Sequence, residues 1–486
     1  MKIIKQNLWL IIIFIVGLAM RLYAAYMDPF LHDWDERFHA LVARNLMDNF
    51  FEPILIKNTI IAFNPIDWSA YHIWLHKQPL FLWQMALSMK IFGVSEFALR
   101  LPSVMMGSLM LLMIYRITFN LTQNKTTSLI AALLLCFSNY QIQLISGIEG
   151  MDHNDVAFEF YMMASCWAYT EYVKSNNWYW VILIGIFSGS AVLNKWLVGL
   201  AIYLGWGINL LISVYRTKSI KELRWIIISL MICCVIFLPW QIYAFYKWPK
   251  EALFEMQFNS RHITEVLEGH WGPPSYYFDA FDLYFGKYLW WLIPIGIFYF
   301  FQSKKFDSKM ITAFSSIFIF TFCFFSFVVK TKVHSHFFFV VPFALIFIAN
   351  AFSNLIESRR NKIITSIIII GISYLSIQPK YFIDYLNKGN YIREKFIHNA
   401  NIYRNIKKCI PNDTKYVANI NALEHINVMF YNNDITACQK SLAEKDLNLL
   451  KLKKEKLTVF ESHNEYQLNE TTLQFPYLFI IHQKLR

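Results

Sequence analysis

Long apolar segments recur along this chain and constrain its fold more than any other feature. Each is about 17 to 25 residues long, the length that an α-helix needs to cross the hydrocarbon core of a bilayer. Only 16% of the 486 residues are charged, against roughly 25% in soluble globular proteins. The pattern predicts an all-α polytopic membrane protein with about 11 to 13 transmembrane helices.

The apolar segments define an expected topology. The expected spans are residues 8–26, 98–115, 127–146, 155–173, 178–194, 196–215, 225–245, 284–301, 310–329, 337–356 and 363–378. The stretch 79–93 is marginal for a full crossing, so we expect it to lie in the interface or to re-enter the membrane. The first span carries Arg21 near its end and lacks a small-residue cleavage site, which favours a retained anchor over a signal peptide.

Basic residues mark one side of the membrane in this topology. They cluster in alternate connections, at Lys2, Lys5, Arg116, Lys125, Lys174, 216–224, 304–309 and 359–362. Positive charge concentrates in cytoplasmic loops, so these connections and the N-terminus are expected in the cytoplasm. This distribution accounts for the net charge of +12 without a nucleic-acid partner. The extracytoplasmic face receives residues 27–97, 147–154, 246–283, 330–336 and the tail.

The chain changes character after about residue 378. "DTKYVANINALEHINVMFYNN" alternates and then turns helical, while "KLTVFES" and "PYLFII" are typical of strands. We therefore expect a transmembrane domain at 1–378, with interfacial helices in its outer loop 27–97, and a small extracytoplasmic α/β domain at 379–486. Cys409 and Cys438 lie in this second domain and could pair in an oxidising compartment.

Two outer connections each carry several carboxylates at the membrane boundary. The first, "LHDWDERFHALVAR", places Asp35 and Glu36 at the start of an amphipathic helix. The second, "GIEGMDHNDVAF", contains Glu149, Asp152, His153 and Asp155. An acidic helix cap explains one acid in each connection but not the others. Paired carboxylates serve as general bases or hold a metal, so we expect one shared site.

Basic side chains are expected on the same face. They are Lys77, Lys195, Arg261, His262, Lys330, Lys332, His334 and His336. A single lysine at a membrane boundary is often a snorkelling anchor. Several cations from different connections, opposite carboxylates, are more typical of a phosphate site, because Lys binds phosphate as a point charge. The expected substrate-binding residues are Glu36, Lys77, Asp152, Lys195, Arg261, His262, Lys332 and His336.

Five motifs occur in order along the chain: "DERFHALVARNL", "HKQPLFLWQMALSMKIFGVSEFALRLPSVMMG", "MDHNDVAFEFYMMASCWAY", "LNKWLVGL" and "KVHSHFFFVVPFALIFIA". With these motifs the chain resembles the polytopic GT-C glycosyltransferases, specifically the bacterial aminoarabinose transferase and protein O-mannosyltransferase group that uses polyprenyl-phosphate sugars. "FGVSEFALRLPS" is particularly specific. The resemblance implies a GT-C fold in the inner (plasma) membrane, with membrane lipids around it.

The resemblance also implies roles for individual residues. It makes Asp35 the catalytic carboxylate and Asp155 the acid that opens the fourth helix, although Asp152 competes for that second role. Lys77 corresponds to the lysine of the family's Lys-Pro-Pro-Leu stretch, and Lys195 to the lysine of its Leu-Thr-Lys-Gly stretch.

The expected reaction is an inverting transfer of a sugar from a polyprenyl-phosphate donor to a glycolipid, glycan or protein acceptor. No cofactor is required, and a divalent metal is possible but not implied. Gln78 and Trp196 stand where the family usually has Pro and Gly, which leaves the sugar and the acceptor open. The alternatives are a transporter or flippase of a lipid-linked substrate, and a non-catalytic scaffold. Transport is disfavoured because the helix interiors are nearly free of charge.

Overall fold

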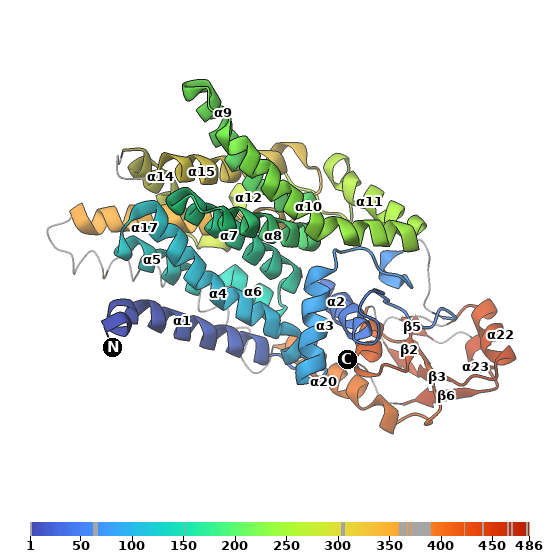
Figure 1. Ribbon diagram of the computed structural model, residues 1–486. Coiled ribbons are helices and arrows are strands. Elements are labelled where there is room, and N and C mark those ends of the chain that lie inside the picture. The colour runs from blue at the N-terminus through green and yellow to red at the C-terminus, as the bar shows by residue number, and fades with distance from the viewer. Residues whose placement is uncertain are drawn as a thin grey trace. The chain divides into compact units, whose positions relative to one another are not determined.

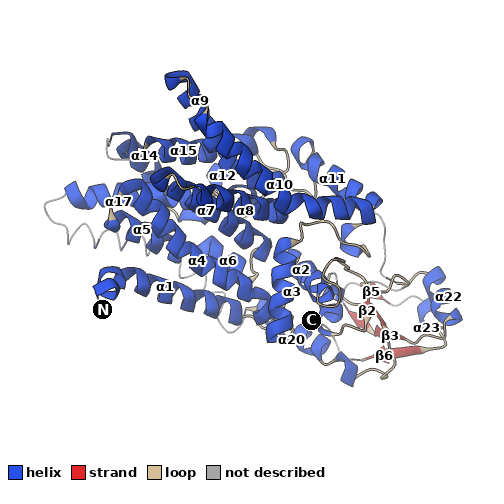
Figure 2. Cartoon of the chain, in the orientation of Figure 1, coloured by secondary structure: helices blue, strands red, loops and turns tan. Residues whose placement is uncertain are grey.

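The computed structural model divides the chain into two compact units, each made from two separate stretches of sequence. The first unit contains residues 1–24 and 103–382, and the second contains residues 25–102 and 383–486. The structure describes residues 2–61, 67–150, 152–302, 307–358, 367, 371, 390–421, 423–439, 442–463, 466–467, 470–482 and 485. All strands within these ranges belong to the second unit (Figure 2).

The first unit is a bundle of helices (Figure 1). They are α1 (Lys2–Tyr26), α4 (Glu96–Thr122), α5 (Lys125–Cys136), α6 (Asn139–Ser146), α7 (Asp152–Ser175), α8 (Trp178–Lys195), α9 (Ala201–Thr217), α10 (Lys221–Lys247), α11 (Pro249–Thr264), α12 (Tyr276–Asp279), α13 (Phe281–Phe285), α14 (Leu292–Gln302), α15 (Ser308–Cys323), α16 (Ser335–Phe338) and α17 (Val341–Ser358). Shorter turns are η2 (Trp196–Leu200), η3 (Leu289–Trp291) and the π-helical η4 (Phe324–Val328). The border between the units runs through α1 and α4.

Several of these helices can cross a membrane. Five stretches are long and apolar enough: Asn7–Tyr26, Glu96–Thr122, Trp178–Thr217, Lys221–Lys247 and Ser308–Val328. A sixth is added if α5 and α6, which meet at 43°, form one bent span. The expectation of a multi-pass membrane protein is therefore confirmed, with five or six such stretches in the described residues rather than the 11 to 13 expected.

Several other expected spans are not among these five or six stretches, and their helices show why. α7 occupies the expected span 155–173 but carries several charged residues. α14 has 11 residues, a rise of roughly 16 Å against a hydrocarbon core of about 30 Å. α17 has 18 residues and lies in the expected span 337–356. The expected span 363–378 lies outside the described residues except for residues 367 and 371.

The stretch Trp178–Thr217 contains two helices rather than one long span. α8 ends at Lys195, and Trp196 has a left-handed φ of 57°. Gly199 then lies against α8, where a Cβ would be only 2.5 Å from the backbone nitrogen of Val192. The chain therefore folds back on α8 directly after Lys195, as expected if α8 and α9 are separate spans.

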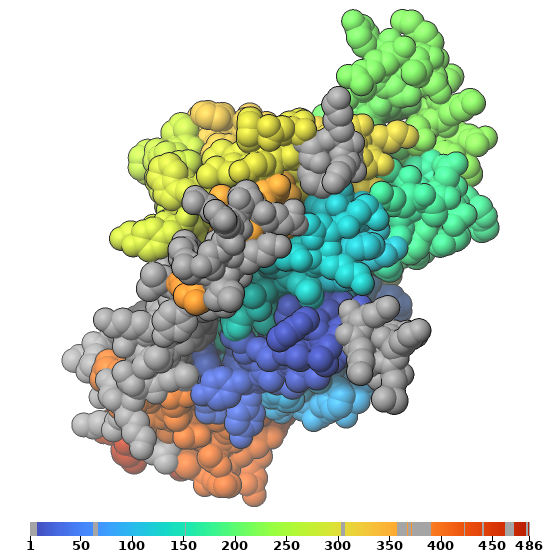
Figure 3. Space-filling view, turned by 90° about the vertical axis from the view of Figure 1, so that its left-hand side faces the viewer, coloured from blue at the N-terminus to red at the C-terminus, as the bar shows by residue number. Residues whose placement is uncertain are grey.

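A buried polar network links four helices of the first unit, α1, α5, α6 and α7. Arg21 of α1 donates to the carbonyls of Leu135 at 3.1 Å and Cys136 at 3.3 Å, in the last turn of α5 before the chain breaks to α6. It also donates to Oε1 of Gln141 at 2.5 Å, and Gln141 donates to Oε2 of Glu159 at 2.8 Å. Figure 3 shows the dark blue surface of α1 beside the cyan surface of α5. We expected the helix interiors to be nearly free of charge. This expectation is wrong here, because Arg21 and Glu159 are both buried and are joined through the side-chain amide of Gln141.

The second unit combines the first outer loop with the C-terminal part of the chain. Its helices are α2 (Asp35–Leu46), η1 (Trp68–Ala70), α3 (Leu80–Phe92), α20 (Tyr391–Arg404), η5 (Ile406–Lys408), α21 (His425–Tyr431), α22 (Glu444–Leu452) and α23 (Glu470–Leu473). α3 has 13 residues, a rise of roughly 20 Å. This length agrees with the expectation that the stretch 79–93 does not cross the membrane fully.

The small α/β fold expected at the C-terminus is confirmed. Four strands, β1 (Tyr416–Ala418), β2 (Thr436–Ala437), β3 (Leu457–Phe460) and β6 (Leu478–Ile481), form a parallel sheet in the order β2-β1-β3-β6. A separate antiparallel pair consists of β4 (Ser462–His463) and β5 (Tyr466–Gln467). Helices α21 and α22 connect successive parallel strands, because parallel strands need crossover connections. No disulfide bond joins Cys409 and Cys438 in the structure.

The first outer loop is part of the same folded unit. Ile61 is buried in the hydrophobic core of the α/β fold, where it packs with Tyr416 and Leu457. Arg393 of α20 binds Asp28 at 2.7 Å. This grouping differs from the expected division near residue 379, because burial of the loop's apolar residues against the sheet domain was not visible in either segment alone.

Candidate active site

Asp35 is the first residue of α2 and follows a strained backbone position. Trp34 has φ 62° and ψ −123°, a conformation that L-residues rarely adopt, and its side chain is 61% exposed. Such strain clusters at functional sites when the surrounding structure enforces it. The Asp35 side chain is half-buried, so it is accessible at the start of a helix whose dipole favours a carboxylate.

The surrounding structure that fixes this turn is a buried ion pair. Glu36 is fully buried and accepts two hydrogen bonds from Arg100, at 2.6 and 3.0 Å, and one from the His32 backbone N–H at 2.6 Å. Arg100 also donates to the carbonyls of Asp28 and Phe30, both at 2.8 Å. Burial raises the pKa of Glu36, but the charge and hydrogen bonds of Arg100 outweigh burial and lower that pKa below its usual value.

These contacts give Glu36 a structural role instead of the expected substrate-binding role. Arg100 was not among the expected site residues, although it lies in "FGVSEFALRLPS", the most specific of the motifs. The sequence did contain one indication that Arg100 is important, because a lone Arg just inside an apolar helix requires a partner for its charge. The partner, 64 residues earlier in the chain, was not predictable from the local sequence.

We expect the Arg100→Met variant to destabilise the second unit by about 3 to 5 kcal/mol, because Glu36 would remain buried and unpaired. The double variant Glu36→Gln/Arg100→Met removes both charges and should recover part of this loss. Thermal unfolding of the purified protein in neutral detergent measures both. Equal destabilisation by the single and double variants would contradict the assignment of this pair.

The C-terminal domain holds the same loop from a second direction. Arg393 of α20 donates to the Asp28 carboxylate at 2.7 Å and to the Met27 carbonyl at 2.8 Å. At the other end of α20, Arg404 binds Glu96 at 2.5 Å and also contacts the Pro29 carbonyl. The segment before Asp35 is thus fixed by Arg100 of α4 and by Arg393 and Arg404 of α20.

The segment that carries Lys77 packs on α2. Trp68 stacks on His76 with ring centroids 4.6 Å apart, and its ring also contacts Phe38 of α2 at 4.9 Å. His39 of α2 contacts Trp74, which is fully buried. The structure therefore joins the Asp35 and Lys77 segments in one aromatic cluster, with Lys77 itself half-buried beside His76.

Asp155 and Lys195 form a close ion pair in the first unit. Lys195 Nζ lies 2.5 Å from Asp155 Oδ1 and 3.3 Å from the Ser335 carbonyl. The Asp155 side chain is 2% exposed and that of Lys195 is 15% exposed. Three connections that the topology places on the extracytoplasmic face, at 147–154, 195 and 330–336, therefore meet at one ammonium group.

The structure separates the two candidate acids of this turn. Asp152 begins α7 with φ 40° and accepts a hydrogen bond from the Asn154 backbone N–H at 3.3 Å. This contact is typical of a residue that caps the start of a helix. Asp155, one turn further on, faces Lys195. Asp155 is therefore joined to an expected phosphate ligand.

Aromatic side chains surround the Asp155–Lys195 pair. Lys195 lies over the Phe158 ring at 5.9 Å, and Tyr284 donates to the His334 carbonyl at 2.7 Å. Tyr276 stacks on His334 with ring centroids 5.2 Å apart. Burial raises the pKa of Glu149, and the nearby charge of Asp155 raises it further. This environment is apolar in its walls with few charged groups, which is typical of small-molecule sites.

Lys332 has a structural role that the sequence did not reveal. Its ammonium is buried and donates to the carbonyls of Phe325 at 2.5 Å, Ser326 at 2.8 Å and Val329 at 2.7 Å. These carbonyls lie in and just after η4, at the end of α15, where a helix leaves acceptors without partners. We therefore do not include Lys332 among the proposed donor ligands.

The other expected cations lie in two paired segments of the first unit. Backbone hydrogen bonds join Thr331 to His262 at 3.1 Å and Lys332 to His270 at 2.9 Å. Arg261 is exposed and binds Glu265 at 2.7 Å. His336 stacks on Phe325 with ring centroids 4.8 Å apart. The two outer connections are thus in contact, as a shared extracytoplasmic face requires.

The expected site residues are distributed over both units. Asp35, Glu36 and Lys77 belong to the second unit, and the other seven belong to the first. A single site containing Asp35 and Asp155 therefore stays a prediction. Among the described residues, no group of three or more His, Cys, Asp or Glu side chains is arranged to hold a metal. The expectation that no metal is required stays a prediction as well.

The fold and these sites define the class of protein that the chain resembles. Residues 76–243 match the family model of dolichyl-phosphate-mannose-protein mannosyltransferases. The structure has the GT-C fold of ArnT from Cupriavidus metallidurans, solved with bound undecaprenyl phosphate, with a TM-score of 0.66, 14% identity and coverage of 92% of this chain and 88% of that one. The oligosaccharyltransferase of Archaeoglobus fulgidus is similar with a TM-score of 0.54 and 14% identity, over 89% of this chain and 64% of that one.

A relative identified by sequence is a transferase of the same class. The undecaprenyl phosphate-alpha-4-amino-4-deoxy-L-arabinose arabinosyl transferase of Yersinia pestis is 26% identical over 203 residues, 40% of this chain. The match spans 35% of that relative's length. The family match and this relative support the resemblance to the aminoarabinose transferase and protein O-mannosyltransferase group.

Proposed function

We propose that this protein is an integral membrane glycosyltransferase. It moves a sugar from a polyprenyl-phosphate donor to an extracytoplasmic lipid, glycan or protein acceptor, with inversion at the anomeric carbon. The single observation that carries the proposal is the Asp155–Lys195 pair, which lies among aromatic rings where three expected outer connections meet. The GT-C fold, shared with an enzyme solved with undecaprenyl phosphate, supports the donor class.

The proposed reaction breaks the bond between the anomeric carbon and the donor phosphate oxygen. The acceptor hydroxyl oxygen forms the new bond to that carbon from the opposite face, and its proton passes to Asp35. The polyprenyl phosphate leaves with the bonding electrons and an added negative charge. Lys195 and Lys77 offset this charge as it develops, which lowers the barrier because the cations are already in place.

Asp155 acts through Lys195 in this mechanism. Its carboxylate fixes the ammonium in one position, with the Ser335 carbonyl as a second acceptor. A lysine held by two partners loses little rotamer freedom when the phosphate arrives, so more of its interaction is available for catalysis. The proposed reaction requires no cofactor or metal, because side-chain cations can stabilise the leaving group.

The sugar and the acceptor are best identified in cells. We expect a strain that lacks this protein to lose one fixed sugar mass from its glycolipids, glycans or glycoproteins, as measured by mass spectrometry of each fraction. Expression of the wild-type chain should restore that mass, and Asp35→Asn should not. Restoration by Asp35→Asn would favour the transporter or scaffold alternative over an enzyme.

The proposed orientation places the N-terminus in the cytoplasm and the C-terminal domain outside. Asn432 is a poor labelling site because it is buried and donates to the Tyr403 carbonyl at 2.8 Å. Lys453, at the end of α22, is exposed. We expect Lys453→Cys to react with an impermeant thiol reagent in intact spheroplasts, and Lys174→Cys to react only after the membrane is opened.

Native cysteines that are accessible would also react with the thiol reagent. The exposed Cys323 and the half-buried Cys409 are therefore first replaced by Ser. Labelling of Lys453→Cys only from the cytoplasmic side would overturn the topology. The assignment of Asp35 and Asp155 to an extracytoplasmic site depends on this topology and would then be wrong.

A further inference from the structure

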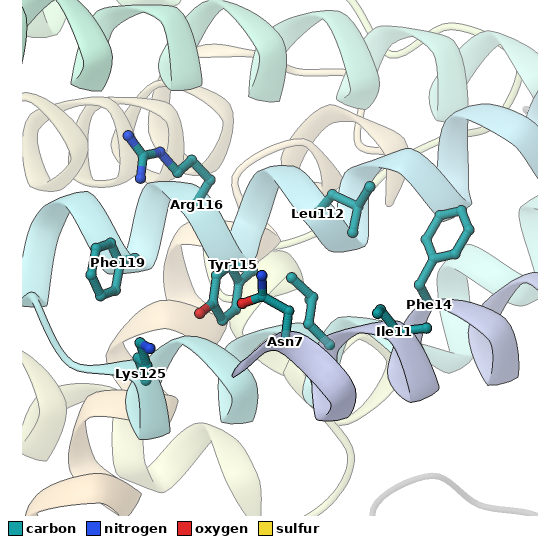
Figure 4. A pocket seen from close by; sticks show the side chains of 9 residues that line it. Asn7, Ile11, Phe14, Leu112, Tyr115, Arg116, Phe119 and Lys125 are labelled. Carbon is teal, nitrogen blue, oxygen red and sulfur yellow. The ribbon is translucent and has the colours of Figure 1, made fainter. Parts of the chain in front are cut away.

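A groove opens in the first unit between α1, α4 and α5, away from the proposed active site. Its volume is about 580 Å³. It is lined by Asn7, Leu10, Ile11, Phe14, Leu112, Tyr115, Arg116, Phe119 and Lys125 (Figure 4). Ile11 and Leu112 are each 38% exposed, so the apolar wall is open at the surface of a membrane-spanning bundle.

The groove is amphipathic along its length. Figure 4 shows Phe14 and Ile11 at one end and Lys125 beside the Phe119 ring at the other, with Asn7 and Tyr115 between them. Apolar side chains at one end and hydrogen-bonding groups with a cation at the other match a molecule that has a hydrocarbon tail and an anionic head. A wholly apolar groove would not distinguish one lipid from another.

The positive charge at the polar end has two sources. Lys125 is the first residue of α5, is exposed and makes no ion pair with the residues that the structure describes. It therefore stands at the positive end of the α5 helix dipole. Asn124 caps that end by accepting from the Thr126 and Thr127 backbone N–H groups. An anion at this position interacts with both the ammonium and the helix end.

Arg116 does not supply this charge. Its guanidinium points away from the groove in Figure 4 and binds Glu171 of α7 at 2.5 and 3.0 Å. This contact locates the groove along the bundle axis, because Glu171 is 16 residues after Asp155 on the same helix. The two positions are separated by a rise of roughly 24 Å, so the groove lies near the membrane boundary opposite Asp155 and Lys195.

We propose that this groove binds one anionic glycerophospholipid of the cytoplasmic leaflet. The phosphate lies at Lys125 and the start of α5, and an acyl chain runs between Ile11, Phe14 and Leu112. The cytoplasmic leaflet is the side with an excess of anionic lipid, and the basic connections place Lys125 on that side. The bound lipid would contact α1, α4 and α5, two of which, α1 and α5, are also joined by the buried Arg21 hydrogen bonds.

The test uses the full-length protein in neutral detergent, titrated with dioleoyl-phosphatidylglycerol or dioleoyl-phosphatidylcholine and examined by native mass spectrometry. Wild type should bind one phosphatidylglycerol at least fivefold more tightly than phosphatidylcholine. Lys125→Gln should lose about fivefold in affinity for phosphatidylglycerol, the effect of one basic residue near an anionic lipid. Leu112→Trp, which fills the apolar end, should weaken binding of both lipids.

Lys218→Gln is the matched control, because Lys218 is an exposed basic residue of the same expected face outside the groove. It should bind both lipids as wild type does. Equal losses in Lys125→Gln and Lys218→Gln would show non-specific annular lipid and overturn the proposal. Displacement of phosphatidylglycerol by an equimolar amount of undecaprenyl phosphate would also overturn it and assign the groove to the donor.

Discussion

Asp35→Asn should reduce glycosyl transfer by about 10²- to 10⁴-fold, the range expected when a general base is removed. The amide is nearly the same size as the carboxylate but cannot take the acceptor proton. The α2 start should survive the change, because Asn is also favoured near helix N-termini and the turn is fixed by the Glu36–Arg100 pair. Transfer from a polyprenyl-phosphate sugar into the acceptor fraction measures the effect.

Asp33→Asn is the matched control for this experiment. Asp33 is exposed and lies two residues before Asp35, where it pairs with Arg37. The amide keeps an oxygen that can accept from the Arg37 guanidinium, whose side chain is buried, so this variant should retain most of the transfer activity. Activity of Asp35→Asn within about tenfold of wild type would exclude Asp35 as the base, since that loss is smaller than the range for such a role.

Lys195→Met should lower the rate of transfer by about 10²- to 10³-fold, comparable to removal of one group that stabilises charge in the transition state. The variant also leaves the buried Asp155 carboxylate without its ammonium partner, so stability should fall. The double variant Asp155→Asn/Lys195→Met should regain stability without regaining activity. Recovery of stability without recovery of activity would show that Lys195 has a role in the reaction as well as in folding.

Donor binding provides the second measurement for Lys195. Wild type should bind undecaprenyl phosphate more tightly than undecaprenol, and Lys195→Met should reduce the affinity for the phosphate while leaving that for the alcohol unchanged. Lys195→Arg keeps the charge and should retain part of the preference. Equal loss of affinity for both ligands would indicate structural damage and remove Lys195 from the phosphate site.

The contacts of α20 also change how the C-terminal domain should be tested. Deleting the domain would remove Arg393 and Arg404, which bind the loop before Asp35, and would expose Ile61. Such a deletion therefore cannot separate acceptor recognition from the positioning of Asp35. Arg393→Gln, which keeps the domain and removes one contact to Asp28, is the better probe of that positioning.

The local sequence predicted those features that depend on local physical constraints. A bilayer requires long apolar helices wherever the chain crosses it, so most spans were visible as hydropathy. The strands after residue 379 were visible as short runs of apolar and β-branched residues, although β1 and β3 are buried on both faces. Asp155 and Lys195 could be identified as candidate site residues, because few charged groups lie at the membrane boundary and such groups usually have a function.

Tertiary structure alone decided which polar groups meet. Glu36 looked like a ligand in the sequence, but Arg100 binds it. Lys332 also looked like a ligand, but the turn after α15 brings its ammonium to three carbonyls three to seven residues before it. Asp152 and Asp155 lie one turn apart at the start of α7, and the structure pairs Asp155 with Lys195. The cost of burying a charge depends on its partner in space, and the sequence within a few residues carries no information about a partner 40 or 64 residues away.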